Sequence, residues 1–181
     1  MFKTTTAYDP NKTSYPILIA ICLAHLSNDL IQAVIPASYP LLKENFHLNF
    51  AQIGIITFCF QLASSLLQPI VGMYTDKHPK PYSQIIAMMF SFVGIIALSF
   101  ANSYYAVLFA VTMVGIGSSI FHPESSRVAY LSSGGKRSLA QSIFQIGGNT
   151  GTALAPLLLA WFVIPAGQRN ILWFIVVVLI A

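Results

Sequence analysis

A polar face interrupts the first long apolar segment of this sequence, in the stretch CLAHLSNDLIQAVIP at residues 22–36. His25, Asp29 and Gln32 are spaced four and three residues apart, so a helix would carry all three on one side. A carboxylate at the centre of a bilayer costs about 3 kcal/mol or more unless it faces a partner or water. Burial also disfavours the charged form, so such a group can bind a proton near physiological pH. The spacing therefore predicts a proton- or ligand-binding face.

Two interpretations stay open for each ionisable residue of this face. Asp29 could carry protons inside a helix bundle, or it could make a structural hydrogen bond to a neighbouring helix. His25 could line the same cavity, or it could only bond a backbone carbonyl, as a single histidine in a membrane often does.

A second polar group lies in GIGSSIFHPESSRVAYL, residues 115–131, where the fourth apolar segment ends. Glu124 and Arg127 are three residues apart and could pair on a helix. Pro123 lacks a backbone donor and favours a kink or a helix end. We expect His122, Glu124 and Arg127 to form a charge cluster at the inner end of this helix. The alternative is an ordinary helix end with a solvated ion pair.

Amides and a charged turn complete the candidate site. Gln145 and Asn149 are four residues apart on one helix face, and we expect both of them, together with Gln61, to line a ligand cavity. The glycines at 147, 148 and 151 are expected to serve close helix packing. The turn after the second apolar segment could latch the inner ends of the helices together, and its predicted gating residues are Gly72, Asp76, Lys77 and Lys80.

The composition determines the class of protein that must position these residues. Of 181 residues, 56% are hydrophobic and only 8% are charged, whereas a soluble domain carries about 25% charged residues. Most of the surface must therefore face lipid. The basic residues form no dense cluster, which argues against nucleic-acid binding. Cys22 and Cys59 are expected to be free thiols, because we place them at different depths in the bilayer.

Apolar segments predict an all-α integral membrane bundle behind a polar tail at residues 1–14. Five segments approach or exceed the ~20 residues that cross a bilayer. The sixth has 11 residues and is still apolar at Ala181, so we expect an incomplete sixth helix and a chain cut from a longer protein. The predicted helices cover residues 15–42, 51–73, 82–101, 104–121, 139–165 and 171–181.

Charges between the segments predict the orientation. With the N-terminus in the cytoplasm, seven lysines and arginines lie inside and two lie outside, as the positive-inside rule requires. We therefore expect a multi-pass protein of the bacterial inner membrane. FQLASS at residues 60–65 and FQIGGN at 144–149 also form a faint repeat, which suggests that two three-helix repeats make up the bundle.

Together these segments resemble the N-terminal half of a major facilitator superfamily transporter. The family's loop G-x-x-x-D-R/K-x-G-R/K-R/K is matched at Gly72, Asp76, Lys77 and Lys80, although Pro79 replaces the inner glycine. The arginine and glutamine of the fourth-helix motif R-x-x-Q-G-x-G are replaced. The fifth-helix antiporter motif is present only in part, around Gly151 and Pro156.

The sequence is more closely similar to the fosmidomycin resistance branch of that superfamily. HLSND, FQLASSLLQP, GSSIFHPESSRVA and AQSIFQIGGN resemble that branch in the expected order. This resemblance implies export of a small drug such as the phosphonate fosmidomycin by proton antiport. From its position inside the first apolar segment, we expect Asp29 to be the proton carrier. The implied partners are a small-molecule substrate, protons, the lipid bilayer and either the missing C-terminal half or a second copy.

Two other classes of protein are compatible with parts of the sequence. The chain could be a truncated half that does not transport unless it pairs with a second bundle. It could also be a membrane metalloenzyme, since His25, Asp29, His122 and Glu124 could hold zinc. Against this class, His25 lies in mid-helix while His122 is expected at the inner end of its helix. We therefore predict no metal site, no cofactor and no enzymatic activity.

Overall fold

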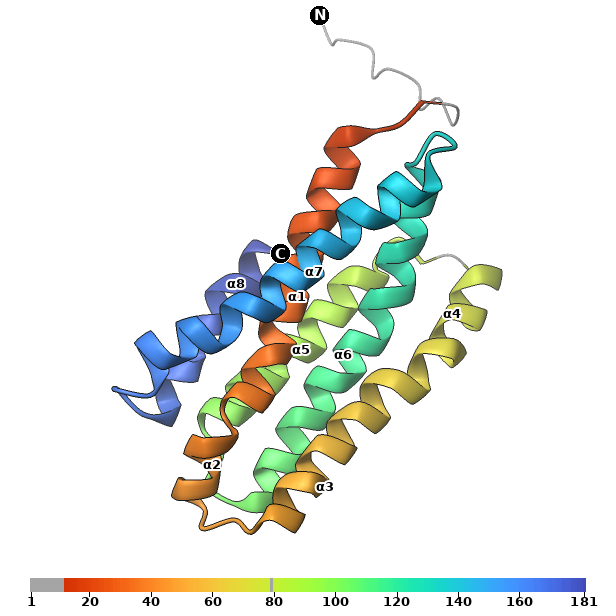
Figure 1. Ribbon diagram of the computed structural model, residues 1–181. Helices are drawn as coiled ribbons and strands as arrows, with labels where there is room; N and C mark the ends of the chain where they lie inside the picture. Colours follow the sequence, from red (N-terminus) through yellow and green to blue (C-terminus); the bar gives the residue numbers. More distant parts are fainter. Residues whose placement is uncertain (1–11, 79) are drawn as a thin grey trace, which may run out of the picture.

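The computed structural model describes residues 12–78 and 80–181, which form a bundle of long helices lying alongside one another (Figure 1). Residues 1–11 of the predicted tail and Pro79 of the predicted gating loop lie outside this described part. The end of the tail is held against the loop that follows Leu131, where the Ser14 N–H donates to the Ser132 carbonyl at 3.0 Å.

Helices and turns make up the described residues. Helices α3 and α4 are joined by a π-helical turn, η1 (Leu62–Leu66), and α7 continues into another, η2 (Leu159–Val163). A 3₁₀ segment, η3 (Gln168–Trp173), leads into α8. The α-helices are α1 (Tyr15–Ala37), α2 (Tyr39–Asn45), α3 (Phe50–Gln61), α4 (Leu67–Lys77), α5 (Ser83–Ser99), α6 (Tyr104–Leu131), α7 (Arg137–Leu158) and α8 (Phe174–Ile180).

Local chemistry explains where several helices begin. Asn49 caps α3 through a reciprocal pair of bonds with Gln52, both 2.9 Å long, which satisfies two free backbone donors. The Ser103 hydroxyl accepts from the Ala106 N–H at the start of α6. Prolines occupy the first turns of α1 and α2, where a missing N–H costs nothing.

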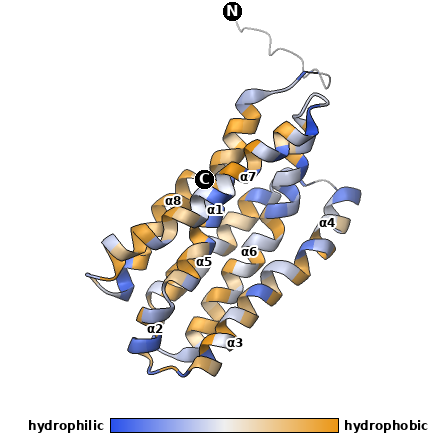
Figure 2. Ribbon diagram, viewed as in Figure 1, coloured by the Kyte–Doolittle hydropathy of each residue, from blue (hydrophilic) through white to orange (hydrophobic). Residues whose placement is uncertain are grey.

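The membrane fold predicted from composition is confirmed. Four described helices are long and apolar enough to cross a bilayer, and two further apolar helical stretches are shorter (Ser83–Ser99 and Gln168–Ile180). The four long spans are Tyr15–Ala37, Phe50–Lys77, Tyr104–Leu131 and Arg137–Val163. Figure 2 shows apolar residues over most of the bundle, while hydrophilic residues interrupt α1 inside it and collect at the end of α4.

Several helix boundaries differ from those expected, and the second span, for example, runs on to Lys77. The first apolar segment breaks at Ser38 between α1 and α2. The fourth span does not end at Phe121, because α6 continues through Pro123 to Leu131. A proline inside a helix costs about 3 kcal/mol, but here the helix beyond it buries Ser125 and Ala129 completely. Packing of this last part of α6 offsets the lost backbone bond.

The helices pair in a repeated order: the first span packs on the fifth, and the fourth span packs on the second. Helix α1 packs along α7, as α6 packs along α3, η1 and α4; α5 lies against α6, and α8 lies against α1 and α5. In Figure 1 α5 and α8 lie behind these paired helices. This arrangement is what two three-helix repeats would produce, as the two similar FQ segments suggest.

Glycines allow the closest of these helix crossings. A Cβ added to Gly147 would meet the Cys22 carbonyl, and one added to Gly151 would meet the Leu26 carbonyl. The backbones of α1 and α7 therefore approach each other without side chains between them. Cys22 and Cys59 are both free thiols.

Candidate functional site

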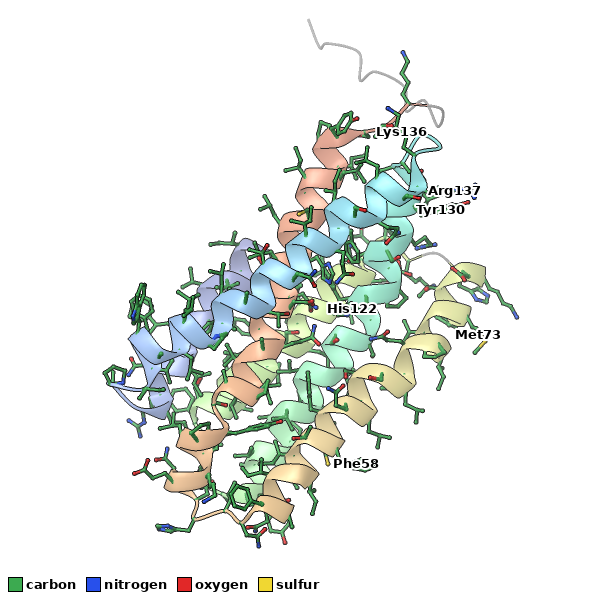
Figure 3. The ribbon with its side chains drawn as sticks, viewed as in Figure 1. Phe58, Met73, His122, Tyr130, Lys136 and Arg137 are labelled. Carbon is green, nitrogen blue, oxygen red and sulfur yellow. The ribbon has the colours of Figure 1, made fainter. Side chains whose placement is uncertain are left out.

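A cluster of ionisable side chains forms where α1 meets α6. Helix α1 presents His25, Asp29 and Gln32 on one face, as their spacing predicts, and α6 adds His122. Asp29 Oδ2 lies 3.2 Å from His25 Nε2, and Asp29 Oδ1 lies 3.3 Å from His122 Nε2. Figure 3 shows His122 about midway along the bundle.

The position of His122 corrects the sequence prediction. His122 was expected at a helix end beside Glu124 and Arg127, at a different depth from His25. Because α6 does not stop at Pro123, His122 lies within the helix and its ring centroid is 5.2 Å from that of His25. The four residues of the Asp29 cluster are thus His25, Asp29, Gln32 and His122.

Backbone carbonyls orient both imidazole rings. His25 Nδ1 lies 2.8 Å from the Phe144 carbonyl, and His122 Nδ1 lies 3.0 Å from the Ser118 carbonyl. A carbonyl oxygen only accepts, so each Nδ1 must carry the hydrogen. Both Nε2 atoms are therefore left to face the Asp29 carboxyl group.

This orientation determines where protons can sit. In a neutral imidazole with hydrogen on Nδ1, Nε2 is an acceptor, and an ionised carboxylate is also an acceptor only. With no further proton, lone pairs on both Nε2 atoms would oppose lone pairs on the Asp29 oxygens. At least one proton shared between Asp29 and the histidines relieves this opposition. The arrangement can therefore bind and release a proton.

Amide and hydroxyl groups hold the carboxyl group in place. The Ser118 hydroxyl donates to Gln32 Oε1 at 2.8 Å, and Gln32 Nε2 donates to Asp29 Oδ1 at 3.0 Å. Asn28 Nδ2 also lies 3.1 Å from Oδ1. Sequence reasoning missed Asn28 and Ser118, although Ser118 stands four residues before His122 and would have followed once α6 was extended.

Helix α7 forms the wall behind His25. The Phe144 ring stacks on His25 with centroids 3.8 Å apart. A Cβ added to Gly148 would lie 2.5 Å from His25 Cε1 and 2.6 Å from Asp29 Oδ2. Gly148 was expected only to aid packing, and it also leaves the space that the Asp29 cluster fills.

The Asp29 cluster opens toward one side. His25 is buried, with 2% of its side chain exposed, whereas the side chains of Asp29 and His122 are 16% and 26% exposed. The Asp29 cluster is therefore reachable from the exposed side of α6 but closed toward α7.

The other predicted cavity residues lie apart from this cluster. Gln145 Nε2 donates to Asn149 Oδ1 at 3.1 Å, and Gln61 Oε1 lies 3.4 Å from the Ser64 hydroxyl. Gln61, Gln145 and Asn149 are all exposed. These hydrogen bonds stay within single helices, so in the described part of the chain the three amides do not join Asp29.

The Glu124–Arg127 pair borders the predicted gating loop. Arg127 Nη2 donates to Glu124 Oε2 at 2.7 Å, and Arg127 Nη1 lies 3.4 Å from the Thr75 carbonyl of α4. Gly72 faces Pro123, whose Cβ would lie 3.6 Å from a Cβ added there. The ends of α4 and α6 are therefore joined through these residues.

The charged residues predicted for the gating loop lie at the surface, but Asp76 and Lys77 belong to the last turn of α4 rather than to a loop. Asp76, Lys77 and Lys80 are exposed. Lys80 also lines a pocket of about 250 Å³ with Gln84, Glu124 and Arg127. The loop and the ion pair thus lie together at one end of the bundle, whereas His122, which was expected beside them, contacts Asp29.

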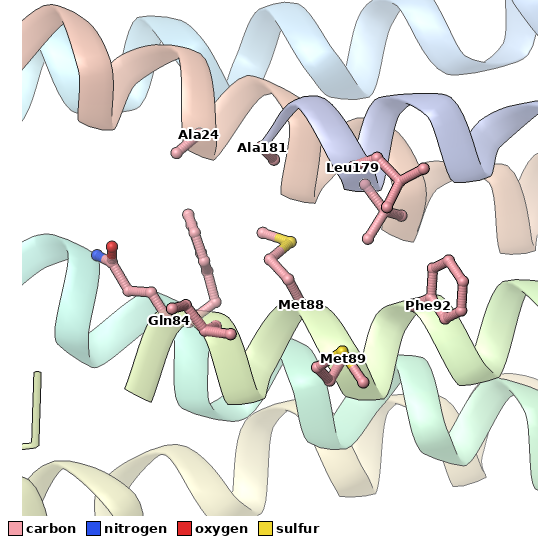
Figure 4. Close-up of a pocket in the computed structure, with 10 residues that line it drawn as sticks. Ala24, Gln84, Met88, Met89, Phe92, Leu179 and Ala181 are labelled. Carbon is pink, nitrogen blue, oxygen red and sulfur yellow. The ribbon is translucent and has the colours of Figure 1, made fainter. Parts of the chain in front are cut away.

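A larger pocket offers no charged side chain. It has a volume of about 530 Å³ and lies among α1, α5, α6 and α8. Figure 4 shows Met88, Met89 and Phe92 of α5 on one side and Ala24 and Leu179 on the other. Its lining is mostly apolar and includes none of the four residues of the Asp29 cluster.

The Asp29 cluster is also the group among the described residues that could hold a metal ion. One ligand atom from each of His25, Asp29 and His122 lies within 4.8 Å of the others. The separation in depth that argued against such a site is wrong, for the reason given above.

Comparison with known proteins agrees with this architecture. Residues 18–181 match the Major Facilitator Superfamily. The chain is 56% identical over 170 residues to the fosmidomycin resistance protein of Escherichia coli strain K12, covering 94% of this chain and 42% of that protein.

Two further relatives are transporters of bacteria. The uncharacterized MFS-type transporter YfnC of Bacillus subtilis strain 168 is 49% identical over 179 residues, covering 99% of this chain and 44% of that protein. The probable sulfoacetate transporter SauU of Cupriavidus necator H16 is 26% identical, covering 88% of this chain and 37% of its own length.

The chain spans less than half the length of these relatives. The family match covers nearly all of the described spans, so the resemblance inferred from the motifs is confirmed. This multi-pass membrane protein belongs to the major facilitator superfamily.

Proposed function

We propose that this chain forms the N-terminal half of a proton-coupled antiporter that exports fosmidomycin-like or other small drugs across the bacterial inner membrane. The proposal is carried by one observation: a carboxyl group inside a membrane-spanning helix has a histidine Nε2 atom facing each of its oxygens. The similarity to a fosmidomycin resistance protein supports the substrate class.

In this proposal Asp29 and the two histidines share the transported proton. The proton enters from the outside, sits between the Asp29 oxygens and an Nε2 atom, and leaves to the cytoplasm. Its release restores the repulsion between facing lone pairs, which favours rearrangement around Asp29. Gln32 and Ser118 keep the carboxyl group oriented in both states.

Substrate would bind beside this cluster, on the exposed side of the bundle. Gln61, Gln145 and Asn149 come from the two spans that flank α1 and α6. Their amides could donate to and accept from a polar drug. This placement agrees with substrate sites at the midplane of transporters built from repeats.

The charged end of the bundle would lie in the cytoplasm, with the N-terminus on the same side. Glu124 and Arg127 would exchange partners as access alternates, while Gly72, Asp76, Lys77 and Lys80 latch the inner end. The 3.4 Å contact from Arg127 to the Thr75 carbonyl supports a link between the ion pair and the latch.

Alternating access requires a second bundle. We propose that the C-terminal half supplies it in the full-length protein, since the relatives are more than twice as long as the segments matched here. A chain that never transports is not favoured, because transporters are among the proteins to which it is similar.

The test uses the full-length protein in inverted membrane vesicles. Asp29→Asn keeps the size of the side chain but cannot exchange a proton, so fosmidomycin uptake driven by a pH gradient is expected to fall at least tenfold. Glu44→Gln is the matched control, because Glu44 is an exposed carboxylate of α2. Gradient-driven uptake that survives in Asp29→Asn would disprove the assignment.

A further inference from the structure

We infer that His25, Asp29 and His122 form a binding site for one divalent transition-metal ion of the zinc and cobalt class. Two imidazoles and one carboxylate converge from α1 and α6, and their ligand atoms lie within 4.8 Å of one another. Zinc, cobalt and nickel favour such nitrogen-rich sites, whereas magnesium and calcium favour oxygen ligands alone.

Distances within the cluster suit a single small ion. Zinc bonds of about 2.0–2.1 Å in a tetrahedron place neighbouring ligand atoms about 3.3 Å apart. The two distances from Nε2 atoms to Asp29 oxygens are 3.2 and 3.3 Å. These distances run to different Asp29 oxygens, and one ligand atom from each residue lies within 4.8 Å of the others, so side-chain rotations are needed to bring the three ligands around one ion.

The rings already have the orientation of metal ligands. Metal-binding histidines almost always donate their second ring N–H to a carbonyl, carboxylate or water. Both Nδ1 atoms here point at backbone carbonyls, from Phe144 at 2.8 Å and Ser118 at 3.0 Å. Both Nε2 atoms are thereby presented to the same carboxyl group, one facing each of its oxygens.

One of these ligands is buried without a hydrogen bond. His25 is 1% exposed, and its Nε2 atom is close to Asp29 Oδ2 but is not aligned to hydrogen-bond with any described group. A buried polar atom in this situation is costly. An ion placed between Nε2 and the carboxylate would satisfy it.

The cluster also leaves a way in and room for a further ligand. Asp29 and His122 are partly exposed, so a water or substrate atom could complete the coordination from that side. The missing side chain at Gly148 keeps the opposite side clear, since a Cβ there would lie 2.7 Å from His25 Nε2.

This site goes beyond the transport cycle proposed above and does not depend on it. The ion would use the same lone pairs that a proton uses, so one would exclude the other. Zinc is therefore expected to inhibit transport from the exposed side. Binding itself is a property of the resting protein and can be measured without transport.

The experiment adds Co²⁺ to purified full-length protein and follows the visible absorption bands of the bound ion, with Zn²⁺ calorimetry as a second readout. We expect one ion per chain at micromolar concentration and no response to Mg²⁺. His122→Gln and His25→Ala should each weaken binding at least tenfold. His47→Ala with His78→Ala is the matched control, because both histidines lie outside this cluster.

A variant that removes no ligand tests the space that the ion needs. Gly148→Ala should also weaken Co²⁺ binding, because its Cβ enters the space beside His25 and Asp29. Unchanged binding in His122→Gln, or binding lost only in the His47→Ala/His78→Ala protein, would overturn the site. Loss of drug efflux in Asp29→Asn has no bearing on that result, so the two proposals fail separately.

Discussion

At the scale of single residues, the Asp29 cluster depends on two histidines whose Nδ1 atoms are engaged by backbone carbonyls. The sequence already predicted that His25, Asp29 and Gln32 share a face, because helical periodicity alone decides it. It could not predict that His122 joins them. That contact depends on how α1 and α6 pack, and on whether Pro123 ends the helix.

Gly148 provides a test of the space that the cluster needs. Gly148→Ala would place a Cβ 2.5 Å from His25 Cε1 and 2.6 Å from Asp29 Oδ2. Such overpacking costs about 1–3 kcal/mol, and we expect gradient-driven efflux to fall several-fold while the protein still folds. Efflux in vesicles and thermal unfolding in detergent measure the two effects.

Gly54→Ala is the matched control for this change. A Cβ at Gly54 in α3 meets nothing within 4 Å, and alanine is favoured over glycine in a helix by about 1 kcal/mol. The control should therefore transport normally and unfold at the same or a higher temperature. Equal behaviour of the two variants would show that Gly148 does not limit the site.

At the scale of elements, α7 positions His25 because its glycines let its backbone pack directly against that of α1. Gly151 lies against the Leu26 carbonyl, so Gly151→Val must force the two helices apart. We expect a loss of unfolding free energy of about 1–3 kcal/mol and a loss of efflux, because the stacking of Phe144 on His25 depends on the same crossing.

Ala153→Val is the control for that substitution. Ala153 is exposed on the same helix, so the added methyl groups should change the unfolding temperature little. Thermal unfolding of the two purified variants decides the matter. A Gly151→Val protein as stable as Ala153→Val would mean that the close crossing contributes nothing.

The positions of the spans could be predicted from the sequence, but the end of α6 could not. Apolar length predicted the spans, since a bilayer requires about 20 residues for each crossing. The end of α6 was misplaced because Pro123 and the charges after it are typical of a helix end, whereas Glu124 is in fact buried and paired with Arg127. Burial of a charge through tertiary contacts leaves no local signal.

At the scale of the whole molecule, the Asp29 cluster lies between two pairs of packed spans, α1 with α7 and α6 with α3 and α4. It stays open on one side, where Asp29 and His122 are partly exposed. A transporter of this type needs a second bundle to close that side. Residues 1–181 expressed alone are therefore expected to give no drug resistance, and co-expression with the remaining half of the protein should restore it. Growth on fosmidomycin measures both; resistance from residues 1–181 alone would require a dimer of this chain.

Coupling of proton movement to drug movement through Asp29 can be measured in proteoliposomes. Proteoliposomes of full-length protein carrying Asp29→Asn are assayed for drug–drug exchange without a gradient and for drug accumulation driven by a pH gradient. We predict that exchange persists while gradient-driven accumulation is lost. Accumulation at the level of the unaltered protein would rule out Asp29 as the proton carrier, because the proton would then travel by another residue.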